Sequence, residues 1–179
     1  MERQSAITLV ELLFALAVLA IVLATAVPGF TSMVMNIRMT NSVNELIHAL
    51  HMARQHASAT GTPAALCGSN GDRPVCSDSR DWSRGWLLFV NNDEDDPPQV
   101  DPGEAVLARV RLDHPLRLYA NRDGFALRPL GMRSTNGTLV WCDARGAGDA
   151  RAVVLSYTGK PRISTSTANG APLTCPGRQ

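Results

Sequence analysis

An apolar run extends from Ile7 to Val27, and Glu11 is its only charged residue. As a helix, a run of this length spans about 30 Å, which is the thickness of the hydrocarbon core of a bilayer. The apolar part of a secretory signal is shorter and ends at a small-residue cleavage site, whereas a Pro-Gly-Phe sequence follows here. The pattern therefore predicts a membrane-spanning helix that stays in the protein.

The next segment has the periodicity of an amphipathic helix. We expect Pro28 to interrupt or loosen the helix, because proline lacks a backbone donor and presses on the preceding turn. Beyond it, apolar residues recur at helical spacing and polar residues occupy the other side, up to a Gly-Thr-Pro end signal at 61–63. A helix is thus predicted to about residue 60. Its apolar positions are Val34, Ile37, Val43, Leu46, Ile47, Leu50, Ala53 and Ala57, and its polar positions are Arg38, Asn41, Asn44, Glu45 and His48.

The rest of the chain consists of short apolar runs between turn-rich segments, a pattern typical of β-strands. From 106 to 112 the alternation places Val106, Ala108, Val110 and Leu112 on one face. The predicted fold class is α+β: a long N-terminal helix, with a membrane-spanning half and an amphipathic half, packed on an antiparallel β-sheet domain. The candidate strands are 64–67, 86–90, 105–112, 116–119, 125–127, 138–142, 152–157 and 162–164.

The composition indicates a folded protein of modest size. With 179 residues, the chain has room for one ordinary domain and an appendage. Its 45% hydrophobic and 18% charged residues exclude a disordered chain. The net charge of +1 hides an asymmetry, because 12 of the 16 acidic residues lie in 1–108 and 11 of the 17 basic residues lie in 109–179. A basic C-terminal half can matter for polyanionic partners.

Four cysteines lie beyond the membrane segment: Cys67, Cys76, Cys142 and Cys175. Their even number and loop-rich surroundings favour two disulfides formed in an oxidising compartment. Three connectivities are possible, and we favour Cys67–Cys76 with Cys142–Cys175 because each pair closes a loop bounded by predicted strands. A zinc site is the alternative, but the chain has no C-x-x-C and no C-x-x-H spacing.

Glu11 is the residue that a plain membrane anchor does not explain. An ionised carboxylate in hydrocarbon costs at least about 2.5 kcal/mol unless it is partnered or near the interface. No Lys or Arg lies between Arg3 and Arg38. Cleavage after Ala6 would give Ile7 a free ammonium about 6 Å along the helix from Glu11, supplying a positive charge within the chain or to a neighbouring subunit. The alternative is that Glu11 snorkels to the headgroup region.

This N-terminal sequence resembles the type IV pilins and pseudopilins. Their short polar leader is followed by a motif close to G-F-T-L-x-E and an apolar helix. Here residues 1–6 form the leader and A-I-T-L-V-E aligns with the motif, with Ala6 in place of Gly and Ile7 in place of Phe. Pro28 falls where many members have a proline. The resemblance implies that a prepilin peptidase cuts between Ala6 and Ile7 and methylates the new amine, and that Glu11 neutralises the N-terminus of an adjacent subunit.

The later sequence is similar to the GspH/FimT group of that family, and within it to the FimU-like minor pilins of type IVa pili. The similarity lies in M-A-R-Q-H-A-S, in W-S-R-G-W-L-L-F before an acidic loop, and in V-V-L-S-Y-T-G-K-P-R near the end. It implies the lollipop architecture of pilins, with a leader at 1–6, a transmembrane and assembly helix at 7–35, and a periplasmic globular domain at 36–179. The helix continues in that domain to about residue 60.

The same resemblance implies a structural role and not an enzymatic one. It predicts a minor pilin, held in the bacterial inner membrane and incorporated into the filament, that helps initiate or cap a type IV pilus. Its partners would be other minor pilins, the major pilin, the prepilin peptidase and the inner membrane. The alternative is a GspH-like pseudopilin of type II secretion.

A basic element near the C-terminus suggests a further alternative, a DNA-binding minor pilin for DNA uptake. G-K-P-R at 159–162 resembles the G-R-x-R element of FimT pilins, with lysine in place of the first arginine. The resemblance implies phosphate contacts by Lys160 and Arg162, which would be salt-dependent and largely independent of sequence. Tyr157 is the nearby aromatic that could stack on a base, and a solvated turn is the alternative interpretation. Further phosphate contacts could come from Arg145, Arg151 and Arg178.

No other pattern predicts a metal, cofactor or catalytic site. The acidic run at 93–96, with Asp101 and Glu104, offers calcium ligands but lacks the EF-hand order, and we interpret it as a solvated connection between strands. His48 and His51 lie three apart with His56 nearby, but zinc needs a further ligand that the sequence does not place. Neither a G-x-S-x-G nor a P-loop motif occurs.

Overall fold

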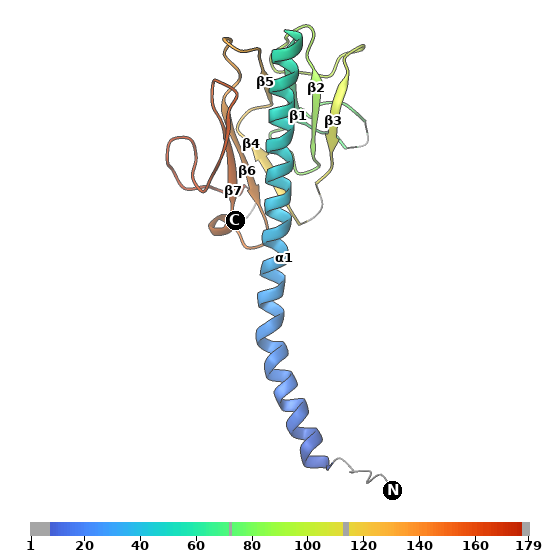
Figure 1. Cartoon of the computed structure of the whole chain (residues 1–179), viewed down its shortest axis with the longest axis vertical. Helices are drawn as coiled ribbons and strands as arrows, with labels where there is room; N and C mark the ends of the chain where they lie inside the picture. Colours follow the sequence, from blue (N-terminus) through green and yellow to red (C-terminus); the bar gives the residue numbers. More distant parts are fainter. Residues whose placement is uncertain (1–7, 72, 113–114, 177–179) are drawn as a thin grey trace. The chain divides into compact units, whose positions relative to one another are not determined.

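The computed structural model describes residues 8–71, 73–112 and 115–176. The chain divides into an N-terminal unit, residues 1–37, and a globular unit, residues 38–179. One helix, α1 (Leu9–Thr60), contributes its first part to the N-terminal unit and its second part to the globular unit (Figure 1).

α1 runs through Pro28 and Gly29 without interruption, so an interruption at Pro28 is not found, and the expected kink or loosened turn stays a prediction. The fixed φ of proline is compatible with a helix, and a single proline removes one backbone hydrogen bond without ending the helix. In the preceding turn, the Thr25 hydroxyl donates to the carbonyl oxygens of Ile21 and Val22 at 3.3 and 3.1 Å. These bonds add local support next to the missing donor.

The end of α1 follows the sequence prediction. Its buried stripe follows it in part, because Ile37 is 48% exposed and Val34 and Ile47 are only partly buried. Gly61 has a φ of 78° and donates its N–H to the carbonyl of Ala57 at 3.0 Å, which closes the last turn. The polar positions predicted for the outer side are exposed. The buried positions recur three or four residues apart, as packing along one face requires: Met39, Val43, Leu46, Ala49, Leu50, Ala53 and Ala57.

The eight predicted strands are present, each within about two residues of its predicted bounds, but they form two antiparallel sheets and not one. The first sheet has the order β3-β2-β1-β5 and the second the order β4-β6-β7-β8. The α+β prediction, a long N-terminal helix packed on antiparallel sheets, is confirmed. The strands are β1 (Ala64–Gly68), β2 (Trp86–Val90), β3 (Val106–Val110), β4 (Arg117–Ala120), β5 (Gly124–Leu127), β6 (Gly137–Cys142), β7 (Arg151–Leu155) and β8 (Pro161–Ser164), with a short 3₁₀ helix, η1 (Ala147–Asp149), before β7.

One hydrophobic cluster joins the globular part of α1 to both sheets. Leu46 and Leu50 of α1 share it with Leu66 and Leu88 of the first sheet and Trp141 of the second. The other face of each sheet has its own cover. Cys76 and Val100 pack on the first sheet, and Leu173 and Cys175 pack on the second.

The alternation predicted for β3 fails at its first residues. β3 pairs with β2 through Leu88 and Ala108, but the next pair is Phe89 with Val106, so Leu107 is an extra residue in a β-bulge. The bulge moves Val106 to the opposite face and leaves it exposed, while Leu107 packs against the main core. A one-residue shift in register exchanges the two faces of a strand.

Candidate functional site

The N-terminal unit is an apolar helix that nothing within the unit covers. Its large apolar side chains from Leu9 to Phe30 are 51–74% exposed. α1 is, in the described part of the chain, the one helix long and apolar enough to cross a membrane. An apolar surface of this extent requires a lipid or protein environment.

Thr8 and Glu11 form the start of this helix. The Thr8 hydroxyl accepts a hydrogen bond from the Glu11 N–H at 3.3 Å, and the Thr8 carbonyl accepts one from the Leu12 N–H at 3.2 Å. Thr8 is therefore the N-cap, and the Thr-x-x-Glu spacing is that of a capping box. The predicted cleavage residues Ala6 and Ile7 lie outside the described residues.

Both disulfides that the sequence favoured are present in the structure. Cys67 pairs with Cys76, and Cys142 pairs with Cys175. The first ties a surface loop to β1, and the second ties the C-terminal segment to the end of β6. All four cysteines are thereby used in covalent bonds.

Lys160 and Arg162 lie on the turn and the edge strand that end the second sheet. The β7–β8 turn is closed by hydrogen bonds between Ser156 and Lys160 in both directions: the Ser156 N–H donates to the Lys160 carbonyl at 3.1 Å, and the Lys160 N–H donates to the Ser156 hydroxyl at 3.2 Å. Arg162 lies on β8 and pairs with Val154 of β7. Among the described strands, β8 is at the edge of the second sheet and pairs with β7 alone. Both basic side chains are exposed. The geometry therefore leaves them open to a partner.

Tyr157, the predicted stacking residue, is half exposed, but an arginine already covers one face of its ring. The Arg133 guanidinium lies over the ring, 4.2 Å from the centroid. Such a cation–π contact stabilises the pair by about 0.5–1 kcal/mol at an exposed site. Base stacking could use the other face alone.

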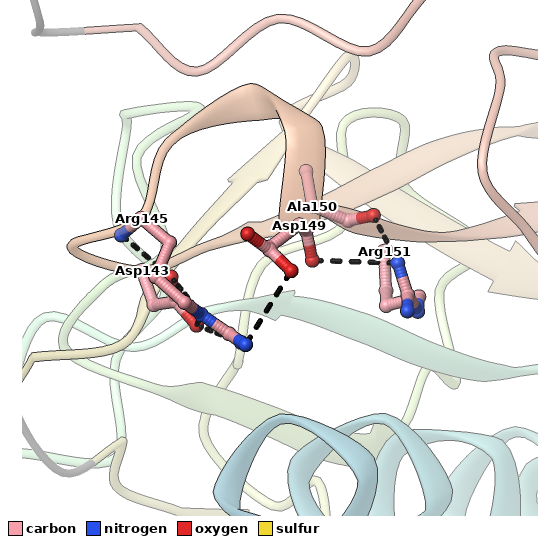
Figure 2. A network of polar contacts seen from close by, with 5 residues as sticks. All are labelled: Asp143, Arg145, Asp149, Ala150 and Arg151. Atoms are coloured by element: carbon pink, nitrogen blue, oxygen red, sulfur yellow. Dashed lines mark hydrogen bonds and ion pairs between the residues drawn. The ribbon is translucent and has the colours of Figure 1, made fainter. Parts of the chain in front are cut away.

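Arg145 and Arg151 are engaged in a local polar network and not in an open basic surface (Figure 2). The Arg145 guanidinium donates to both carboxylate oxygens of Asp143, from Nε at 3.2 and 3.1 Å and from a terminal nitrogen at 2.6 Å. It also lies 3.4 Å from the carboxylate of Asp149. Arg151 donates to the backbone carbonyls of Asp149 and Ala150 at 3.4 and 3.1 Å. Their predicted role in binding phosphate is therefore not supported by these contacts, and Arg178 lies outside the described residues.

The network matters because Asp143 is a buried carboxylate. Its side chain is 1% exposed. Burial raises the pKa of Asp143, but the hydrogen bonds and positive charge of Arg145 outweigh that effect and hold the pKa below its usual range. The network fixes the connection between β6 and β7 and was not foreseen from the sequence.

The acidic loop between β2 and β3 is held by its own hydrogen bonds. One carboxylate oxygen of Glu104 accepts from the Asn92 N–H at 2.6 Å, and the other accepts from the Asp101 N–H at 3.1 Å. Glu104 thus closes the loop across its base. This arrangement is that of a structured connection between two strands.

Within the described residues, the loop also contains a group of three carboxylates. One oxygen each of Asp93, Asp95 and Asp101 lie within 4.8 Å of one another. Burial raises the pKa of Asp95, and the negative charges of Asp93, Asp101 and Glu104 add to the rise. The Gln99 N–H, which donates to Asp95 at 2.9 Å, offsets part of it.

The histidines of α1 lie apart from this group. His48 and His51 are exposed, and His56 is partly buried. They occupy polar positions of the helix surface.

Sequence reasoning missed a turn whose residues are apolar but exposed. Leu130 and Met132 are 73% and 60% exposed and lie next to Arg133. The Pro-Leu-Gly sequence at 129–131 is a turn signal and would have placed these side chains outside the core.

Two family models match the chain. One, described as the prokaryotic N-terminal methylation motif, matches residues 1–27. The other, described as type II transport protein GspH, matches residues 42–159. No match was found among curated proteins.

Two crystal forms of the type IV minor pilin FimU from Pseudomonas aeruginosa are similar in structure. One shares 18% identity, covers 79% of this chain and 97% of that chain, and has a TM-score of 0.50. The other shares 15% identity, covers 73% and 98%, and has a TM-score of 0.49. At such identities the likeness of the first form shows the fold. Because the GspH model spans more than half of its residues, the chain belongs to the type II transport protein GspH family of type IV pilin-like subunits.

Proposed function

We propose that this protein is a minor pilin that helps initiate or cap a type IV pilus, acting as a structural subunit and not as an enzyme. The observation that carries the proposal is a carboxylate, Glu11, in an uncovered apolar helix whose N-terminal sequence matches the methylation motif. A soluble enzyme does not require an exposed apolar helix, whereas a filament subunit requires one at two stages. It holds the subunit in the bilayer before assembly and packs against other helices afterwards.

The charge of Glu11 provides the driving force for moving the subunit from the membrane into the filament. An unpaired carboxylate in hydrocarbon costs about 2.5–3.5 kcal/mol, and no Lys or Arg lies between Arg3 and Arg38. Cleavage between Ala6 and Ile7 creates an N-terminal ammonium, which keeps its positive charge after methylation. Glu11 of one subunit pairs with this ammonium on its neighbour, and the pairing favours the filament over the membrane.

The disulfides support a globular unit outside the cytoplasm. Cys67–Cys76 and Cys142–Cys175 use all four cysteines, and such bonds persist in an oxidising compartment such as the periplasm. In the proposal, α1 is anchored in the inner membrane and the globular unit lies on its periplasmic side. The partners are the prepilin peptidase, other minor pilins and the major pilin.

The experiment compares Glu11→Ala with Glu45→Ala, an exposed acid on the globular part of α1. Both variants should reach the membrane in normal amount. Glu11→Ala should be depleted about tenfold or more from sheared filaments, as loss of a charge pair in hydrocarbon predicts, and Glu45→Ala should not. Mass spectrometry of the native protein should find methylated Ile7 at the N-terminus. Normal incorporation of Glu11→Ala, or a chain that keeps Met1, would contradict the proposal.

A pseudopilus of type II secretion would use the same helix chemistry, and the family description points to that system as well. Deletion of the gene separates the two. The pilus proposal predicts loss of surface pili with secretion unchanged. Loss of secretion with normal pili would place the subunit in the secretion filament.

A second candidate function is contact with DNA through Lys160 and Arg162. It is favoured by the exposure of both side chains on adjoining positions of the β7–β8 turn and β8. A gel shift with residues 36–179 should weaken as salt rises, and Lys160→Ala with Arg162→Ala should reduce the salt slope by about two. Arg84→Ala, which removes an exposed charge elsewhere, is the control. Unchanged binding by the double variant, or none by the parent, would remove the candidate.

A further inference from the structure

The turn between β5 and β6 presents two large apolar side chains to solvent. Leu130 is 73% exposed and Met132 is 60% exposed. Most large apolar side chains of the globular unit are buried in its three hydrophobic clusters. We call residues 129–133 the Leu130 tip. Exposed apolar residues that lie together mark interaction sites more often than isolated ones do.

The Leu130 tip is held in one conformation by hydrogen bonds at its base. The Met132 N–H donates to the Pro129 carbonyl at 3.1 Å, and Gly131 has a φ of 92°, which completes a tight turn. The Arg128 N–H donates to the Ser134 hydroxyl at 3.1 Å. A turn fixed in this way loses little conformational entropy when a partner binds.

The Leu130 tip is also bound to the β7–β8 turn, which extends the surface. The Ser134 N–H donates to the Tyr157 carbonyl at 2.9 Å, and the Arg133 guanidinium lies 4.2 Å from the centre of the Tyr157 ring. Met, Tyr and Arg are enriched at protein interfaces, and Tyr and Arg are also enriched among their hot spots. Met132, Arg133 and Tyr157 therefore form a compact surface of interface composition.

The rim of this surface is positive. Arg133, Lys160 and Arg162 are exposed. The Arg54 side chain reaches the same turn, since a Cβ on Gly159 would lie 3.4 Å from its Cδ. Glu94 lies 3.8 Å from Arg128, next to the tip, and its negative charge is paired with that arginine.

We propose that the Leu130 tip is a docking site for a different filament subunit, whose surface has an apolar socket rimmed by carboxylates. The proposal deepens the filament role and rests on it. Leu130 and Met132 would enter the socket, and Arg133, Lys160 and Arg162 would face the carboxylates.

Two other occupants fit the surface less well. Nucleic acid gains nothing from two aliphatic side chains at the apex, and one face of the Tyr157 ring is already covered by Arg133. A second copy bound tip to tip would bring the positive rim against itself, and like charges across an interface are repulsive. A heterotypic protein contact uses both the apolar apex and the positive rim.

The test places the photoreactive residue p-benzoylphenylalanine at position 130 of the full-length chain in its own host. A matched control carries it at position 75, where Val75 is also exposed but lies on the Cys67–Cys76 loop. Illumination should give an adduct from position 130, and not from 75, with a protein that carries the N-terminal methylation motif. Arg133→Glu should lower the yield of this adduct about tenfold. Replacing the facing carboxylate of the partner by Lys should restore the yield.

A second measurement uses the double variant Leu130→Ser with Met132→Ser, with Val75→Ser as control. Both should form their disulfides and reach the membrane as the parent does. The double variant should be depleted about tenfold or more from sheared filaments. An adduct with DNA or lipid, or no subunit adduct from position 130, would overturn the docking site.

Different results would contradict the filament role and the docking site. If the parent chain is present in filaments and the double variant is incorporated equally well, the docking site is wrong and the filament role stands. If the parent chain is absent from filaments, the filament role is wrong. The docking site then falls with it, because the partner it binds is a filament subunit.

Discussion

The indole Nε1–H of Trp141 donates a hydrogen bond to the hydroxyl of Ser42 at 2.9 Å, joining β6 to α1 across 99 residues of sequence. Trp141 is fully buried in the main core. The indole N–H groups of Trp82 and Trp86 are also buried, but within the described residues they have no acceptor. Trp141 is thus the tryptophan that adds a directed bond to the packing of α1 on the second sheet.

Replacing Ser42 by Ala should destabilise the globular unit by about 1–3 kcal/mol, because it leaves a buried donor unpaired. Urea unfolding of residues 36–179 measures the change. Asn41→Ala, at the exposed neighbouring position, is the control and should stay within about 0.5 kcal/mol of the parent. Equal stability of the Ser42 variant and the parent would show that the bond contributes nothing.

Much of this architecture could be predicted from the sequence because hydrophobic periodicity is a local signal. Most of the buried stripe of α1 beyond Ile37, and the bounds of β2, follow from spacing alone. The bulge at Leu107 could not be predicted, since it depends on how β3 meets β2. For the same reason the sequence did not show that the strands divide into two sheets.

Arg145→Ala should cost about 3 kcal/mol or more at neutral pH, because it leaves the buried Asp143 carboxylate without its cation. The matched control is Arg80→Ala, which removes an exposed pair with Asp123 whose side chains are 64% and 42% exposed. Exposed pairs contribute less than about 1 kcal/mol. Urea unfolding at pH 7 compares the two variants. Similar losses for both would mean that Arg145 does not neutralise a buried charge.

The same pair predicts an acid-dependent stability. The pKa of Asp143 is lowered in the folded protein, so near pH 4 the unfolded chain binds a proton that the folded protein does not. The stabilisation is complete above about pH 5 and is lost as the pH falls below about 4. The difference in unfolding free energy between the parent and Asp143→Asn should therefore shrink over this range. A difference that stays constant from pH 7 to pH 3 would exclude the contribution.

Asp95 should make stability depend on pH in the opposite direction from Asp143. Its pKa is raised by burial and by the neighbouring carboxylates, so the folded protein binds the proton more tightly, and stability falls as the pH rises above about 4. Asp95→Asn should raise the melting temperature at pH 7 and leave it unchanged near pH 3. Asp78→Asn, at an exposed position, should have little effect at either pH. A lower melting temperature for Asp95→Asn at pH 7 would mean that its negative charge is needed in the loop.

The candidate sites differ in how far the sequence could reveal them. Glu11 stands out because a charge in an apolar run is anomalous at the level of sequence. Leu130 and Met132 do not stand out, since apolar residues are expected in a core and only the fold shows their exposure. For Arg145 and Arg151, the sequence gives their charge but not the acceptors that the structure places beside them.

The two disulfides should differ in their contribution to stability. They join cysteines that are 9 and 33 positions apart in the sequence, and the loss of chain entropy in the unfolded state grows with loop length. Replacing both cysteines of a pair by alanine should cost about 3 kcal/mol for Cys67–Cys76 and about 1 kcal/mol more for Cys142–Cys175. The second pair also holds Leu173 against the outer face of the second sheet, so its loss should expose the C-terminal segment to proteases while leaving the first loop protected. Urea unfolding and limited proteolysis of the two double variants, each with the other disulfide intact, make the comparison. A larger loss for the Cys67–Cys76 variant would show that native packing around that loop, and not chain entropy, sets the order.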